Sequence, residues 1–180
     1  MGDVWKWGRQ VGGNSWRTTG DLGLERNTSL PAFYSVGFRN AVLNDYAGPG
    51  AWNDPDYILI GTVGNANEME SPPQPTKLTP DEQYSYMSMW SLMAAPLLFS
   101  GDMTKLDKFT LNVLCNSEVI DIDQDSMGKQ GKVVRKTNQD FILAKPLDDG
   151  SLAVGLFNLT TTRRSVSVDW KELGVGGERI

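Results

Sequence analysis

The chain has 180 residues, of which 39% are hydrophobic and 22% are charged, a composition that indicates a globular protein rather than a disordered one. The 17 basic and 22 acidic residues give a net charge of −5 without any Lys/Arg cluster, so nucleic acid and membranes are not expected partners. The absence of histidine excludes Ser-His-Asp and Cys-His nucleophile systems and His-ligated zinc. Proton transfer must therefore rely on carboxylates, tyrosines or lysines. The single cysteine, Cys115, excludes an internal disulfide and is expected in the core.

The first third of the chain predicts a loop or short helix, a strand and a helix. Residues 3–13 form the loop or short helix, and the β-branched run at 16–19 predicts a strand that ends in the turn Gly20-Asp21. A helix is expected to start near Ser29, as its N-cap, and to run to about Asn44.

The middle of the chain repeats this alternation. A rigid turn with Pro55 between two aspartates precedes the apolar run 57–60, which suits a buried strand or a loop packed beneath a site. The sequence Thr79-Pro80-Asp81-Glu82 predicts a capping box at the start of a well-buried helix that continues to Ala94. Residues 96–102 then predict a short buried strand that again ends in Gly-Asp.

The last part of the chain changes period. Residues 105–116 favour a helix and 118–125 a strand, after which four short strands are expected at 132–136, 141–145, 152–158 and 165–169, with a hairpin turn at 148–150. We place a domain boundary near residue 130, with an α/β unit over 1–130 and an antiparallel β unit over 131–180. Three βα units cannot close an eight-stranded barrel, so the first unit is expected to be part of a larger one.

The spacing of Arg17 and Asp21 allows two interpretations. In a parallel α/β barrel the carboxyl ends of the strands carry the chemistry, so an arginine and an aspartate there could orient a polyol and donate a proton. Alternatively, Asp21 only caps the following loop and Arg17 is its surface partner, because isolated Arg/Asp pairs are common.

Four motifs in order add a family resemblance that covers nearly the whole chain. These are the stretches 13–21 (GNSWRTTGD), 48–56 (GPGAWNDPD), 93–98 (MAAPLL) and 118–131, which ends in DSMGKQG. The chain resembles the C-terminal part of an α-galactosidase (melibiase) of glycoside hydrolase family 27. The resemblance implies the last βα units of a (β/α)8 TIM barrel, followed by the start of a small antiparallel β domain. It implies no cofactor.

The resemblance also implies roles for particular residues in a retaining hydrolysis of terminal α-galactosides. Asp21 takes the position of the general acid/base, and Arg17 that of a ligand to substrate hydroxyls. Asp56 and Tyr57 match substrate-binding positions that line the pocket, although Tyr57 replaces a methionine that is common there. A retaining enzyme needs a second carboxylate about 5 Å from the first. In the family that nucleophile lies in an earlier Tyr-x-Asp-x-Gly setting, which this sequence does not contain, so the chain alone is expected to be inactive.

Several alternatives stay open. The substrate could instead be an α-N-acetylgalactosaminide or a β-L-arabinopyranoside, or the chain could be a non-catalytic carbohydrate-binding or scaffold piece that uses Trp5, Trp7 and Trp52 as stacking platforms.

The expected partner is a galactose-containing oligosaccharide or glycoconjugate, and the whole protein could form a homo-oligomer. The resemblance suggests a secreted, periplasmic or lysosomal location. No metal site is predicted, because the acids at 121, 123 and 125 lack the glycine and distal glutamate of a calcium loop.

Overall fold

The computed structural model describes residues 2–22, 30–64 and 72–176. Its α-helices are α1 (Val4–Trp7), α2 (Ala32–Ala41), α3 (Pro80–Leu92), α4 (Lys108–Leu114) and α5 (Ser117–Asp123). Short 3-10 helices lie at Gly8–Val11, Asn44–Tyr46 and Met103–Lys105. The strands are β1 (Ser15–Arg17), β2 (Trp52–Asp54), β3 (Thr62–Val63), β4 (Gln74–Pro75), β5 (Lys132–Lys136), β6 (Asp140–Pro146) and β7 (Leu152–Asn158).

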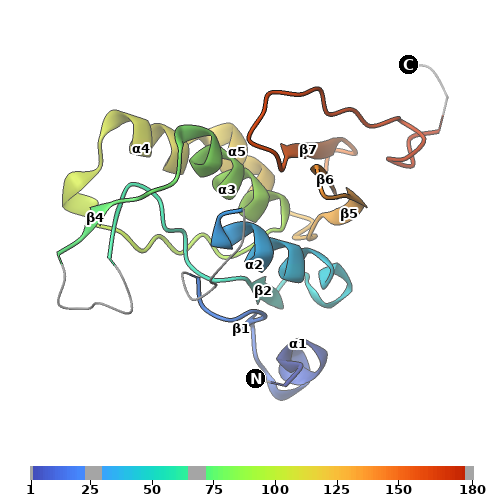
Figure 1. Cartoon of the computed structure of the whole chain (residues 1–180). Coiled ribbons are helices and arrows are strands. Elements are labelled where there is room, and N and C mark those ends of the chain that lie inside the picture. Colours follow the sequence, from blue (N-terminus) through green and yellow to red (C-terminus); the bar gives the residue numbers. More distant parts are fainter. Residues whose placement is uncertain (1, 23–29, 65–71, 177–180) are drawn as a thin grey trace.

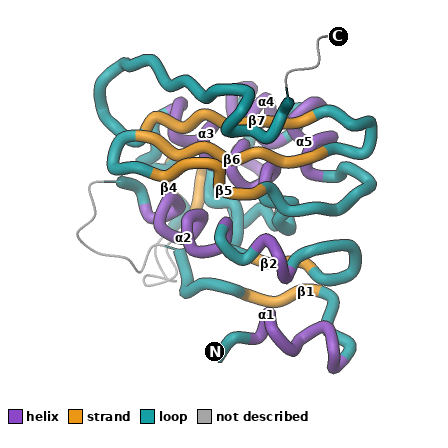
Figure 2. Tube along the Cα trace, turned by 90° about the vertical axis from the view of Figure 1, so that its right-hand side faces the viewer, coloured by secondary structure: helices purple, strands orange, loops and turns teal. Residues whose placement is uncertain are grey.

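The first layer is a short parallel sheet with helical crossovers. Strands β1 and β2 pair in parallel, with Arg17 opposite Asp54. Beyond β2, an isolated parallel bridge joins Ile58 to Phe99, so the segment after α3 lies beside the segment that follows β2. Figures 1 and 2 show α1, β1, β2, α2 and α3 following one another across the molecule. Of the three strands expected in this layer, the one at 16–19 overlaps β1, whereas 57–60 and 96–102 make only this bridge, and β2 was not predicted.

Helix α3 is the centre of the core. It begins with the predicted capping box: the Glu82 amide donates to Thr79 Oγ1, and the Thr79 amide donates to Glu82 Oε2. The ring of Phe33 on α2 stacks on Tyr86 at a centroid distance of 4.6 Å, and Tyr86 meets Trp90 edge-on at 4.5 Å. These contacts fix α2 against α3 by burying large aromatic surfaces.

The second layer is the antiparallel sheet β5–β6–β7, which covers α3 and α5 (Figure 2). The predicted hairpin turn is present between β6 and β7, with Gly150 at a φ of 83° that favours glycine. Phe141 on β6 packs edge-on against Phe38 of α2, and the buried residues of both layers form one hydrophobic cluster. The boundary between 1–130 and 131–180 stays a prediction, and it crosses a shared core.

Lys145 on β6 is fully buried beneath this sheet. Its ammonium group donates to the carbonyl oxygens of Ile122 and Asp123 at the end of α5, and to that of Ser91 near the end of α3. The last carbonyl groups of a helix lack partners within the helix and carry partial negative charge. The lysine therefore joins the ends of two helices to the sheet, and burial lowers the pKa of Lys145.

Four expectations about local structure were wrong or incomplete. The strand expected at 118–125 is absent and helix α5 covers most of it, because Asn116 caps the Val119 amide and the partly buried Val119 and Ile122 pack on one helical face. Residues 165–169 form no strand, and Cys115 is exposed rather than buried. Helix α2 ends at Ala41, before the expected Asn44. The expected cap Ser29 lies outside the described residues.

Candidate active site

Three predicted site residues meet at the carboxyl ends of β1 and β2. Arg17 is the last residue of β1, and it lies opposite Asp54 at the end of β2. The Arg17 guanidinium pairs with Asp21 through Nη2 and Oδ1 at 3.0 Å, and with Asp56 through Nη1 and Oδ1, also at 3.0 Å. One arginine thus joins two carboxylates that are 35 positions apart in the sequence.

Asp21 lies at the rim of this cluster. Its side chain is 66% exposed, whereas that of Arg17 is 22% exposed. Arg17 Nη2 also donates to the Gly20 carbonyl, which holds the turn that presents Asp21. An ion pair of this geometry is what both interpretations of the spacing require. The catalytic assignment of Asp21 therefore rests on the family pattern and stays a prediction.

Asp56 is 1% exposed, and protein groups contact both of its carboxylate oxygens. Oδ2 accepts the Leu22 amide at 2.7 Å, and Oδ1 accepts the Tyr57 amide at 2.9 Å in addition to pairing with Arg17. Its carbonyl oxygen accepts from Trp90 Nε1 at 2.9 Å. The predicted contact between Asp56 and substrate has no direct support in this arrangement, and it stays a prediction.

Tyr57 has a fixed backbone and a free ring. Its carbonyl oxygen accepts from the Tyr86 hydroxyl, while its side chain is exposed next to the cluster. Burial raises the pKa of Tyr86, so this hydroxyl stays a neutral donor. The Tyr57 ring is therefore available to line a pocket. Asp54 has a structural role in the turn after β2: its Oδ1 accepts the Asp56 amide, and burial raises the pKa of the Asp54 carboxyl.

A buried amide network that the sequence interpretation missed lies beneath the cluster. The indole of Trp16 donates to Asn53 Oδ1 at 2.9 Å, and Asn53 Nδ2 donates to Gln130 Oε1 and to the Leu43 carbonyl. Gln130 Nε2 in turn donates to the Asn40 carbonyl. The network joins β1, β2 and α2 to the stretch before β5. The amide residues were visible in the motifs, but nothing in their spacing indicated that they meet.

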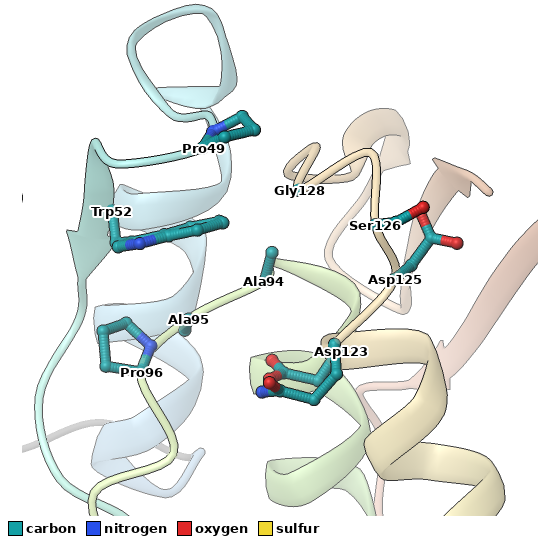
Figure 3. A pocket seen from close by; sticks show the side chains of 10 residues that line it. Pro49, Trp52, Ala94, Ala95, Pro96, Asp123, Asp125, Ser126 and Gly128 are labelled. Carbon is teal, nitrogen blue, oxygen red and sulfur yellow. The ribbon is translucent and has the colours of Figure 1, made fainter. Parts of the chain in front are cut away.

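A separate cavity of about 450 Å³ lies at the opposite end of β2 (Figure 3). Trp52, the first residue of β2, faces the stretch 123–128 across it, and Pro96 lies nearby. Because the cavity is at the amino end of the strand, it is distinct from the Arg17 cluster. Trp52 therefore lines this cavity rather than the candidate active site.

The buried Asp123, which lines this cavity, is expected to make the stability of the folded chain depend on pH. Burial raises the pKa of Asp123 to about 6, against the opposing effects of a hydrogen bond from Gln124 and the charge of Lys145. The folded state thus favours the protonated form, so the contribution of Asp123 is most favourable below about pH 4 and is lost as pH rises through about 6. The loss amounts to at most about 3 kcal/mol in the free energy of unfolding.

We expect Asp123→Asn to remove most of this pH dependence. The measurement is urea unfolding of both proteins at pH 4 and pH 7, with Asp121→Asn as the control, because Asp121 is exposed on the same helix. Equal pH dependence in the wild-type protein and in Asp123→Asn would contradict the prediction.

The described part of the chain contains neither a metal cluster nor a membrane-spanning helix. Within 2–22, 30–64 and 72–176, no group of three or more Cys, Asp or Glu side chains is placed to hold a metal ion. In this part of the chain, no helix is both long and apolar enough to cross a membrane.

Comparisons with known proteins match both layers. The family model described as Alpha galactosidase A matches residues 9–125, and the one described as Alpha galactosidase C-terminal beta sandwich domain matches 141–180. An alpha-galactosidase of Cyamopsis tetragonoloba is 37% identical over 169 residues, which cover 94% of this chain and 37% of that protein. An alpha-N-acetylgalactosaminidase of Gallus gallus is 30% identical, over 82% of this chain and 34% of that protein.

Solved structures agree with the sequence relatives. A GH27 β-L-arabinopyranosidase from Geobacillus stearothermophilus matches with a TM-score of 0.77 and 28% identity, over 90% of this chain and 36% of that one. An α-galactosidase from Saccharomyces cerevisiae matches with a TM-score of 0.71 and 26% identity, over 86% of this chain and 37% of that one. The chain thus spans little more than a third of the length of these relatives.

A parallel βα layer with ionisable side chains at its carboxyl edge, followed by an antiparallel sheet, defines the last part of a (β/α)8 barrel with its appended β domain. The match over residues 9–125 then gives the family: the chain belongs to the alpha galactosidase A family. This confirms the predicted resemblance and fold class.

Proposed function

We propose that this chain supplies the acid/base side of an active site that hydrolyses terminal α-galactosides with retention of configuration. Asp21 protonates the glycosidic oxygen and then deprotonates the attacking water. Arg17 binds sugar hydroxyls, and the exposed ring of Tyr57 lines the pocket. The observation that carries the proposal is the family match over residues 9–125, and the position of Asp21 just after the carboxyl end of β1, where barrel enzymes place their chemistry, supports it.

The second carboxylate of the reaction has to come from elsewhere. Asp56 is the other acid on Arg17, but its oxygens are buried and contacted by protein groups, so it cannot reach an anomeric carbon. Asp54 is partly buried, and its Oδ1 is held by the Asp56 amide. We therefore propose that the nucleophile lies outside the described residues, in the part of the barrel that relatives possess and this chain does not match.

The identity of the sugar is the least constrained part of the proposal. Relatives include an alpha-N-acetylgalactosaminidase and a β-L-arabinopyranosidase, whereas the alpha-galactosidase of Cyamopsis tetragonoloba matches 94% of this chain at 37% identity. These sugars differ in the groups on the ring and not in the acid/base step. We therefore keep the galactoside as the proposed substrate, and propose the same role for Asp21 whichever sugar is bound.

The test uses p-nitrophenyl α-galactoside. We expect no turnover by the purified 180-residue chain, and turnover when it is co-expressed with the part of the Cyamopsis relative that it does not match. Turnover by the chain alone would contradict the proposed absence of the nucleophile. A galactose titration read by tryptophan fluorescence separates the alternative class: millimolar binding without turnover in either preparation would favour a carbohydrate-binding module.

A further inference from the structure

We propose that Asp56 is a positioning residue, which holds Arg17 and the Asp21–Leu22 turn in place, and that it does not bind the substrate. This deepens the proposed function and rests on it for the roles of Arg17 and Asp21. The carboxylate divides its two oxygens between the two parts of the site. Oδ1 pairs with Arg17, and Oδ2 accepts the amide of Leu22, the residue directly after Asp21.

The hydrogen bond from the Leu22 amide to Asp56 fixes the backbone next to Asp21, and so the direction of the Asp21 side chain. The Asp21 side chain is mostly exposed, so burial contributes little to holding it, and its carboxylate is held by the ion pair with Arg17. The segment before it is held to the same turn, because the Thr18 amide donates to the Asp54 carbonyl and Thr19 Oγ1 donates to the Pro55 carbonyl. The bond from the Leu22 amide to Asp56 completes this attachment on the far side of Asp21.

The pairing with Arg17 fixes the guanidinium group. Arg17 Nε is buried and has no hydrogen-bond partner, so the group is oriented through its two Nη atoms. Nη2 contacts Asp21 and the Gly20 carbonyl, which belong to the turn, whereas Nη1 pairs with Asp56. Asp56 is thus the buried partner that holds Arg17 to the segment after β2, in addition to the contacts of Arg17 with the exposed turn.

The backbone of Asp56 shows that the carboxylate is held in place by its surroundings. Its φ of 124° lies in a region that residues with a side chain rarely adopt, so the conformation is strained. The Asp56 amide donates to Asp54 Oδ1, and the Asp56 carbonyl accepts from Trp90 Nε1. These bonds offset the strain and aim the carboxylate at Arg17 and Leu22, away from solvent.

Asparagine at position 56 is the informative substitution, because it offers one acceptor oxygen where aspartate uses two. The remaining oxygen is expected to stay with Arg17 and Tyr57, so the Leu22 amide loses its acceptor and Arg17 keeps only a neutral acceptor at position 56. Asp54→Asn is the matched control in the same turn, since asparagine keeps the oxygen that accepts the Asp56 amide. Asp56→Glu is the conservative variant, since it keeps the charge and both acceptor oxygens.

The experiment is amide hydrogen exchange and arginine side-chain NMR on the ¹⁵N-labelled chain without sugar. In Asp56→Asn we expect the Leu22 amide to exchange at least about 10-fold faster, as for an amide that has lost a hydrogen bond of about 1.4 kcal/mol. The Arg17 Nε–H signal should broaden or vanish, while the amides of α3 stay protected. Asp54→Asn should retain both signals.

Unchanged Leu22 exchange and an unchanged Arg17 signal in folded Asp56→Asn would overturn the proposal, because a group that serves only as a substrate ligand leaves the sugar-free protein unaltered. If the α3 amides show that Asp56→Asn is unfolded, Asp56→Glu decides instead. A partial loss of Leu22 protection or a shifted Arg17 signal in folded Asp56→Glu supports the proposal, because the longer side chain displaces the carboxylate, and wild-type values for both overturn it. Because no sugar is present, failure of the proposed hydrolase function would appear in the turnover assay and leave this result unchanged.

Discussion

An Asp21→Ala protein is expected to lose about 10²–10⁴-fold in kcat/KM on an alkyl or oligosaccharide α-galactoside, and to lose far less on a dinitrophenyl α-galactoside. The alkoxide that leaves from the first substrate must be protonated as the bond breaks, whereas dinitrophenolate leaves without a proton. The measurement compares kcat/KM for both substrates in a preparation that shows turnover, and kcat/KM reports the bond-breaking step. Added azide should also speed turnover of the variant, because azide attacks without needing a base.

The control for this experiment is Arg17→Lys. Arg17 is proposed to bind sugar hydroxyls, which both substrates share, so this variant should weaken the two reactions by similar factors. Similar losses on both substrates for Asp21→Ala would contradict the acid role. They would support the other interpretation of the spacing, in which Asp21 only caps its turn.

Elements with strong local signals were predictable from the sequence. Thr79, Pro80 and Glu82 form a capping box whatever surrounds them, because its bonds lie within four residues. The turn at Gly150 is equally local, since its φ of 83° favours glycine. The cluster at Arg17 was predictable only in part. Carboxyl ends of parallel strands bring side chains together, but the family pattern was needed to select Asp21.

Features that depend on packing were not predictable. The run from Ile120 to Asp123 alternates apolar and acidic residues as a strand does, but a helix brings Val119 and Ile122 onto one face that packs against α3. Asp56 was expected to be a pocket residue because it matches a substrate-binding position in the family that the sequence resembles. Its burial follows from Arg17 and the Leu22 amide, which lie 39 and 34 positions away and are brought to it only by the parallel pairing of β1 and β2.

The structure also separates two aromatic residues, Trp52 and Tyr57, that the sequence offered as candidates for contact with a sugar. Trp52 is the first residue of β2, whereas Tyr57 follows the end of this strand. Trp52 therefore lines the cavity at the amino end of β2, and Tyr57 is exposed beyond its carboxyl end. Of the two, only Tyr57 is adjacent to Asp56 and the Arg17 cluster. A sugar that contacts Asp21 should therefore perturb Tyr57 and leave Trp52 unchanged. Stacking of that sugar on an aromatic ring is expected at the carboxyl end of the sheet, where Tyr57 lies.

Lys145→Met is expected to destabilise the chain by about 3–5 kcal/mol, which is a large part of the 5–15 kcal/mol typical of a folded domain. Methionine has a similar length and suits an apolar core, so the loss comes from polar groups left behind. The carbonyl oxygens of Ser91, Ile122 and Asp123 lose their donor, and the buried Asp123 carboxylate loses a nearby positive charge.

The measurement is the free energy of unfolding from urea titration at pH 7, followed by far-UV circular dichroism. Lys132→Met is the matched control, because Lys132 is exposed at the start of β5 in the same sheet and should change stability by less than about 0.5 kcal/mol. A similarly small change for Lys145→Met would show that the helix ends do not need this donor. A large change at Lys145 alone would show that the antiparallel sheet stabilises α3 and α5 through one buried cation. Since α3 also carries Trp90 and Tyr86, which hold the backbone of Asp56 and Tyr57, the second layer would then support the candidate site from the far side of the core.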